Sequence, residues 1–149
     1  MSSGNSRLPG RIFFHKKHRA LLPEDEKNHA AWLRRIALLS GKKIKQVHFY
    51  LVNDEELLGM NKKFLKHNSF TDILTFDLSS TEKIEAEIFI STDRVLANAK
   101  KFRRKKDDEL RRVMVHGILH LAGFGDKTAK EKKEMRRLEE LALKVFSEN

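Results

Sequence analysis

Residues 72–91 read DILTFDLSSTEKIEAEIFIS, and this stretch decides the fold class. It holds two β-rich segments, at residues 72–78 and 86–91, on either side of a polar turn around residues 79–83. Strands joined by so short a connection pair as an antiparallel hairpin, whereas parallel neighbours need a crossover of a dozen or more residues. The stretch therefore argues against a purely parallel sheet with alternating helices.

The other strands and helices follow from periodicity and from capping residues. Asn53 with Glu56, and Thr128 with Glu131, have the three-residue spacing of a capping box at a helix start. We predict strands at residues 11–16, 44–52, 72–78 and 86–91, and helices at residues 24–39, 54–65, 92–102, 107–121 and 128–146. This order predicts an α+β fold: one sheet of about four strands with about five helices packed on it.

Length and composition indicate one folded domain. The 149 residues are 40% hydrophobic and include ten Phe, enough for a real core, so we predict a single domain over residues 1–149 with residues 1–10 as a loose lead-in. The chain has no Cys, which excludes disulfides and thiolate metal ligands and fits a cytosolic protein. No stretch has the apolar core of a signal peptide or the length of a membrane helix. We expect a soluble, cytoplasmic protein without membrane contact.

The charge of the chain favours a polyanionic partner. Lys and Arg number 31 against 21 Asp and Glu, a net charge of +10. Between Lys100 and Arg137 there are fourteen basic and six acidic residues, so +8 of that charge lies in a quarter of the chain. A concentrated positive field attracts nucleic acid because binding releases the counterions of its phosphates. The alternative is a basic surface that only keeps the protein soluble.

Residues 116–126, HGILHLAGFGD, are the strongest candidate for a functional site. His116 and His120 lie one helical turn apart, beside the apolar stripe, so both imidazoles can face one metal ion. Gly123 permits a sharp, left-handed reversal after the helix, which can bring Asp126 back toward the histidines. Three such ligands leave one coordination position of zinc open, as in catalytic zinc sites.

Two histidines at this spacing are also common as ordinary surface or core residues, and the glycine turn and third donor are what favour a metal site here. Zinc proteases of the H-E-x-x-H type place a glutamate after the first histidine as the general base. In this chain that position is Gly117. Peptide hydrolysis by that mechanism is therefore disfavoured.

The segment resembles the motif H-G-x-L-H-L-x-G-Y-D-H of the YbeY family, the bacterial endoribonucleases of rRNA maturation. The matching residues are His116, Gly117, Leu119, His120, Leu121 and Gly123, with Phe124 in place of tyrosine. A second stretch, NKKFLKHNSFTDILTF, is similar to the family's L-N-x-x-Y-R-x-x-D-x-P-T-D-V-L-S-F, with Asn61, Thr71, Asp72, Leu74 and Phe76 in register. The following EAEIFIS resembles the family's G-D-I-x-I-S strand, and the resemblance spans about residues 44–146.

Two positions depart from the family pattern. The third histidine of the motif falls on Asp126, so the site would combine two imidazoles with a carboxylate, which makes a bound water less acidic. The arginine that the family places four residues after the asparagine falls on Leu65. Its role in the phosphodiester chemistry is vacant, or passes to another cation such as Lys66 or the run Arg103–Lys106.

The resemblance implies a zinc-dependent endoribonuclease that cleaves single-stranded RNA in rRNA maturation and ribosome assembly. His116, His120 and Asp126 would be its catalytic metal ligands for one Zn²⁺, and Asp72 would support a ligand or only hydrogen-bond at a strand start. Zinc would polarise a phosphoryl oxygen or activate a water, and the sequence does not decide between these roles. The predicted RNA-binding residues are Lys66, Arg103, Arg104, Lys105, Lys106 and Arg112.

The expected partners are rRNA and the small ribosomal subunit, with no specificity for DNA. Two alternatives stay open. The first is a non-catalytic rRNA-binding assembly factor in which zinc only holds the turn, which the missing arginine favours. The second is a metal-dependent hydrolase of another substrate, for which the sequence offers no specific general base.

Overall fold

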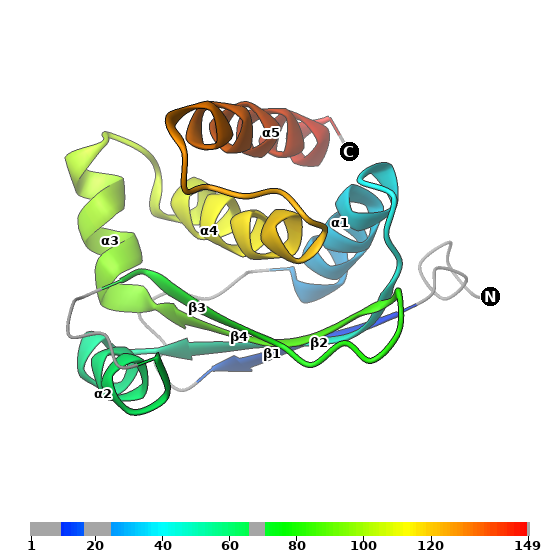
Figure 1. Cartoon of the computed structure of the whole chain (residues 1–149). Coiled ribbons are helices and arrows are strands. Elements are labelled where there is room, and N and C mark those ends of the chain that lie inside the picture. Colours follow the sequence, from blue (N-terminus) through cyan, green and yellow to red (C-terminus); the bar gives the residue numbers. More distant parts are fainter. Residues whose placement is uncertain (1–9, 17–24, 66–70, 149) are drawn as a thin grey trace.

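The structure, a computed structural model, describes residues 10–16, 25–65 and 71–148, apart from the side chains of Lys16, Phe64 and Leu65. Within these ranges four strands and five helices follow one another along the chain (Figure 1). They are β1 (Arg11–Lys16), α1 (Glu26–Leu39), β2 (Ile44–Val52), α2 (Asp54–Leu65), β3 (Ile73–Asp77), β4 (Ile84–Ser91), α3 (Thr92–Lys101), α4 (Lys106–Leu121) and α5 (Ala129–Ser147). The predicted α+β fold, with about four strands and five helices, is confirmed.

The four strands form one mixed sheet in the order β1-β2-β4-β3. β1 pairs with β2, and β2 with β4, in parallel, while β3 runs antiparallel to β4. The hairpin predicted from residues 72–91 is therefore present, but β4 begins at Ile84 rather than at residue 86. Ile84 joins the strand because its backbone N–H donates to the carbonyl of Lys43 at 2.8 Å, a contact between distant segments.

The helices start where their capping residues predicted. Asn53 and Glu56 exchange side chain–backbone hydrogen bonds of 2.8 and 3.3 Å before α2, and Thr128 and Glu131 form a capping box before α5. Ser91 caps α3 by accepting from the backbone N–H of Arg94. The predicted first residue of the α1 segment, residue 24, and the lead-in at residues 1–9 lie outside the described residues.

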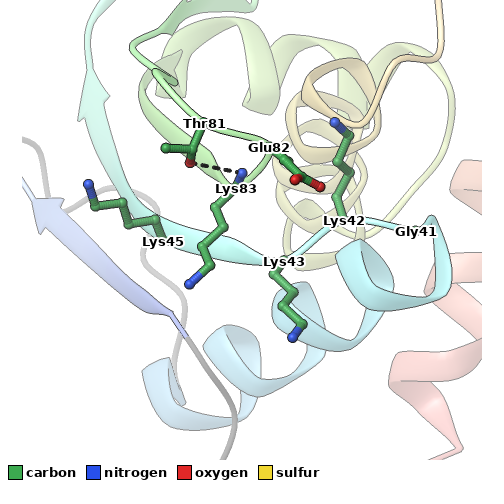
Figure 2. A pocket seen from close by; sticks show the side chains of 7 residues that line it. All are labelled: Gly41, Lys42, Lys43, Lys45, Thr81, Glu82 and Lys83. Carbon is green, nitrogen blue, oxygen red and sulfur yellow. Dashed lines mark hydrogen bonds between the residues drawn. The ribbon is translucent and has the colours of Figure 1, made fainter.

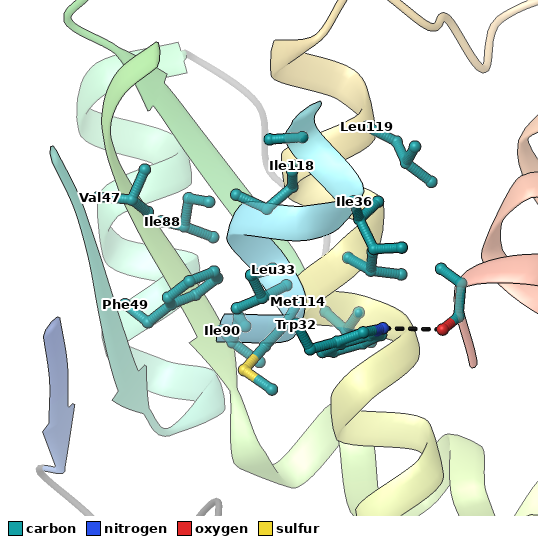
Figure 3. Close-up of a cluster of buried hydrophobic side chains, with 14 of the residues drawn as sticks. Trp32, Leu33, Ile36, Val47, Phe49, Ile88, Ile90, Met114, Ile118 and Leu119 are labelled. Atoms are coloured by element: carbon teal, nitrogen blue, oxygen red, sulfur yellow. Dashed lines mark hydrogen bonds between the residues drawn. The ribbon is translucent and has the colours of Figure 1, made fainter. Parts of the chain in front are cut away.

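The main core lies between the sheet and the helices α1, α3, α4 and α5, which cover one face (Figure 1). Figure 3 shows the inward side chains of β2 and β4 meeting those of α1 and α4. Trp32 of α1 donates its indole N–H to the carbonyl of Ala142 at 2.8 Å and so ties α1 to α5 (Figure 3). α2 lies on the other side of the sheet, where Val52, Leu57 and Leu74 form a second, smaller cluster.

None of the helices in the described ranges is long and apolar enough to cross a membrane.

Candidate functional site

A glycine lets the histidine-bearing helix α4 approach the sheet closely. A Cβ on Gly117 would lie 3.1 Å from the Cδ1 atoms of both Ile73 and Ile88, tighter than ordinary van der Waals contact. The close approach places His116 and His120 beside β3. Both histidines line one cavity of about 350 Å³, together with Asp72, Arg112 and Asp126 among others.

The turn after α4 has the geometry that the sequence predicted. Gly123 has a φ of 110°, and its N–H bonds to the carbonyl of His120 at 3.0 Å. The next residue, Phe124, donates its N–H to the carbonyl of Leu119 at 3.1 Å, which completes a Schellman motif. Phe124 packs on the core, and the reversed chain brings Asp126 Oδ2 to 3.4 Å from His116 Nε2.

The opposite side of the His116 ring is held by Glu139, which the sequence analysis missed. Its Oε2 lies 2.7 Å from His116 Nδ1, and the Glu139 side chain is only 5% exposed. A carboxylate that accepts the Nδ1–H fixes the tautomer of the ring and leaves Nε2 free to bind a metal, as is common for metal-binding histidines. The available signal was an acidic residue on the buried stripe of α5, between Met135 and Ala142.

Arg112 connects this carboxylate to two others. Its guanidinium lies 2.7 Å from Glu109 Oε2, 3.1 Å from Glu139 Oε1 and 3.6 Å from Asp72 Oδ2. Burial alone would lower the pKa of Arg112, but the hydrogen bonds and charges of Glu109 and Glu139 raise it. Burial raises the pKa of Asp72, and the charges of Arg112 and His116 offset part of that rise. The arginine therefore holds together two buried carboxylates and one partly buried carboxylate behind the histidine.

The same carboxylates set the proton affinity of His116. Burial alone would lower its pKa, but the hydrogen bond and charge of Glu139, followed by the charges of Asp126 and Asp72, raise the pKa above the usual value. An imidazole in such negative surroundings favours a positive charge on or beside the ring. A proton on Nε2, or a cation bound there, meets that preference.

Two of the three predicted zinc ligands, His116 and Asp126, are spaced as zinc ligands are. Two ligands about 2.05 Å from one tetrahedral ion lie about 3.3 Å apart, and the His116 Nε2–Asp126 Oδ2 distance is 3.4 Å. His120 lines the same cavity, but its side chain is exposed. Within the described ranges no three His, Asp or Glu side chains are gathered tightly enough to hold an ion. The assignment of His116, His120 and Asp126 as zinc ligands stays a prediction, and it requires His120 to turn toward the other two.

Of the predicted RNA-binding residues that the structure describes, Arg112 alone lines this cavity. Its guanidinium is paired with three carboxylates, and its role in RNA binding stays a prediction. Arg104 pairs with Glu140 at 2.8 Å, and Lys105 and Lys106 are exposed at the start of α4. Lys66 lies outside the described residues.

Arg103 occupies a special backbone position at the end of α3. Its φ is 55°, and the N–H of the following residue bonds to the carbonyl of Ala99 at 2.8 Å, as in the turn after α4. An arginine thus takes the left-handed conformation that glycine usually adopts there. Its side chain is exposed, which leaves the predicted RNA contact untested.

Two further cations border the site from α5. Lys132 and Arg136 line a second hollow of about 210 Å³ together with His116, Asp126 and Glu139. The sequence placed them on a charged helix with no assigned role. The packing of α5 against α4 brings them to the site.

A mixed four-stranded sheet that presents two histidines and a buried arginine–carboxylate cluster at one cavity defines an α+β protein with an enzyme-like polar site. The sequence profile of the endoribonuclease YbeY family matches residues 14–147. A relative named endoribonuclease YbeY from Cytophaga hutchinsonii is 43% identical over 135 residues, which cover 90% of this chain and 94% of the relative. The chain belongs to the endoribonuclease YbeY family.

Other known proteins agree with this placement. The endoribonuclease YbeY of Phocaeicola vulgatus is 37% identical over 122 residues, covering 82% of this chain and 88% of that one. A Thermotoga maritima protein with a known solution structure superposes with a TM-score of 0.62 at 26% identity. That match covers 91% of this chain and 89% of the other, so the resemblance extends over nearly the whole fold.

Proposed function

We propose that this protein is a zinc-dependent endoribonuclease that cleaves single-stranded RNA during rRNA maturation and ribosome assembly. Membership of the YbeY family supports the class of RNA endonuclease. The observation that supports zinc binding is the setting of the His116 ring. Glu139 holds the ring at Nδ1, and its Nε2 faces Asp126. rRNA and the small ribosomal subunit are the proposed partners, and the cytoplasm is the proposed location.

In this proposal one Zn²⁺ is bound by His116, His120 and Asp126, and it supplies a Lewis acid for the phosphodiester. Glu139 keeps His116 in the tautomer that binds through Nε2. Lys132 and Arg136 line a hollow together with His116 and Asp126, and they supply positive charge for the phosphate oxygens. These two cations are further candidates for the role of the family arginine, whose position is taken by Leu65.

The non-catalytic alternative keeps the zinc and the RNA but lacks cleavage. The exposed position of His120 favours it, because a loosely placed third ligand suits an incomplete catalytic centre. A hydrolase of another substrate has less support, since the cavity is bordered by cations that suit phosphate groups.

Metal content and RNA cleavage should be measured together on the wild-type protein and on His116→Ala. The wild type should hold about one zinc per chain and cut a labelled single-stranded RNA, and the variant should lose both. His48→Ala is the matched control, because His48 lies on the outer strand face, stacked on Phe13 and His15.

Each alternative has its own outcome. A wild-type protein that binds zinc but does not cut RNA would favour the assembly factor. A His116→Ala variant with full zinc content would refute the assignment of His116 as a ligand. An Asp126→Ala variant with unchanged zinc and unchanged cleavage would show that Asp126 only shapes the turn.

A further inference from the structure

Four lysines from two distant segments surround a hollow outside the candidate site. Lys42 and Lys43 lie in the connection between α1 and β2, Lys45 is the second residue of β2, and Lys83 is the residue before β4. Together with Gly41, Thr81 and Glu82 they line a pocket of about 550 Å³ (Figure 2). Local sequence does not predict this group, because Lys83 lies far along the chain from the other three lysines and joins them through the pairing of β2 with β4.

The backbone that carries these lysines is fixed by hydrogen bonds. α1 ends in a Schellman motif, in which Gly41 has a φ of 86° and Lys42 N–H bonds to the carbonyl of Ala37 at 2.9 Å. The carbonyl of Lys43 accepts the N–H of Ile84 at 2.8 Å, and the N–H of Lys83 bonds to Thr81 Oγ1 at 3.2 Å (Figure 2). The positions of the lysines are therefore built into the fold.

The charge of this pocket is poorly balanced within the protein. Among the described residues that line it, Glu82 is the one acidic residue, and Lys45 has a further partner in Glu85 at 3.5 Å. In the described part of the chain, no carboxylate oxygen lies within 4.0 Å of the amine of Lys42, Lys43 or Lys83. Like charges held around one hollow repel each other and raise the local concentration of anions. The pocket therefore suits a ligand with more than one negative charge.

The pocket and the histidine cavity share the β3–β4 hairpin. Residues 73–75 of β3 line the histidine cavity, and residues 81–83, in the connection from β3 to β4, line the lysine pocket. The hairpin therefore connects the two hollows.

We propose that this lysine pocket binds the phosphodiester backbone of single-stranded RNA beside the cavity where the strand is cut. The inference rests on the proposed function for the identity of the polyanion, but it requires only RNA binding. Lysine amines contact phosphates as point charges and do not read bases, so the contribution of the pocket is independent of RNA sequence.

The test is RNA binding by the full-length, metal-free protein, which separates binding from cleavage. Fluorescence anisotropy of a labelled oligouridylate should be measured over a range of salt for wild type and for the double variant Lys43→Gln/Lys83→Gln. Each phosphate contact contributes about −0.7 to the slope of log affinity against log salt concentration. Lowering the salt from 1 M to 0.1 M therefore strengthens binding about five-fold per contact. The double variant should bind at least about five-fold more weakly at 0.1 M salt, with a shallower slope.

A control of equal charge change isolates the pocket. Lys27→Gln/Lys144→Gln also removes two exposed lysines, one near the start of α1 and one in the last turn of α5, and should bind as the wild type does. Equal binding by the pocket variant and this control would overturn the proposal. Lys43 and Lys83 are exposed, so both variants should fold, and circular dichroism melting checks this.

Two further measurements distinguish RNA from a small phosphate ligand in the pocket, and distinguish failure of the pocket proposal from failure of the nuclease proposal. Inorganic phosphate or uridine monophosphate that binds in a Lys43-dependent way, with RNA affinity unchanged in the variant, would assign the pocket to a small ligand and overturn the proposal. An absence of cleavage by the wild type would refute the nuclease while leaving lysine-dependent RNA binding intact. Unchanged RNA affinity in the pocket variant, with cleavage abolished by His116→Ala, would refute the pocket alone.

Discussion

Replacing Glu139 with glutamine tests whether α5 holds the histidine of the candidate site. Glu139 accepts hydrogen bonds from His116 Nδ1 at 2.7 Å and from Arg112 Nη1 at 3.1 Å while almost fully buried. Glutamine keeps the shape but has one acceptor oxygen and no charge. One of the two donors must therefore face an amide NH₂ group, and the Arg112 guanidinium loses one of its counter-charges.

The expected loss of stability follows from this contact set. A hydrogen bond to a charged group is worth about 1.5–3 kcal/mol, and breaking a buried ion pair by removing one partner costs about 3–5 kcal/mol. Because Glu109 and Asp72 still neighbour Arg112, we expect Glu139→Gln to reduce the free energy of unfolding by about 2–4 kcal/mol.

The loss should also depend on pH. The folded-state pKa of His116 is raised, despite burial, by the hydrogen bond and charge of Glu139 and by the charges of Asp126 and Asp72. Protonation of His116 therefore stabilises the folded protein fully below the unfolded-state pKa of about 6.5, and this stabilisation is lost as pH rises through the folded-state pKa. The glutamine variant should lose more stability at pH 6 than at pH 9.

Urea unfolding of the metal-free protein at both pH values measures the loss, and an NMR titration follows the His116 ring. Glu134→Gln is the matched control on the same helix, because Glu134 is an exposed residue paired with Arg137 at 2.7 Å. It should unfold at nearly the wild-type urea concentration. Equal stability of Glu139→Gln and wild type, with an unchanged His116 pKa, would refute the role assigned to Glu139.

Two of the turns with positive φ, at Gly123 and Arg103, supply two further predictions. Gly123→Ala forces a residue with a Cβ into a φ of 110°, so we expect the melting temperature to fall by an amount equivalent to about 1–2 kcal/mol. The loss comes from backbone strain alone, because an added Cβ meets no atom within 4 Å. An unchanged melting temperature would mean that the turn relaxes freely. Arg103→Gly relieves the strained φ of 55° and should stabilise the protein by up to about 1 kcal/mol in thermal melts. If Arg103 also contacts RNA as predicted, the same variant will bind RNA more weakly.

Local signals in the sequence predicted the elements of the fold well. Capping at Asn53 and Thr128, and the reversal at Gly123, depend on residues within a few positions of each other, and all three are present. The start of β4 was wrong by two residues because the pairing of Ile84 with Lys43 spans 41 positions. Strand ends set by such distant pairing leave no local pattern in the sequence.

The candidate site divides in the same way. The sequence singled out His116, His120 and Asp126 from their spacing, and the structure places all three on one cavity. The sequence did not single out Glu139. This residue lies 23 residues beyond His116 and reaches it through the packing of α5 on α4. The sequence also did not show that Arg112 lies against three carboxylates, because spacing along the chain does not reveal which charged groups meet in the folded protein.

The cluster behind His116 is acidic within a basic protein, and this contrast bears on its chemistry. Asp72, Glu109 and Glu139 surround the single guanidinium of Arg112, and Asp126 faces the other side of the His116 ring. With a neutral imidazole the negative charge of these four carboxylates exceeds the positive charge of the one guanidinium, even though burial raises the pKa of Asp72. A cation bound at Nε2 would reduce this excess, and the cationic residues around the cavity mouth would then attract the phosphates of RNA toward it. A carboxylate as the third ligand is consistent with such a site, because it adds to the attraction for the ion while the surrounding lysines and arginines restore the attraction for the substrate.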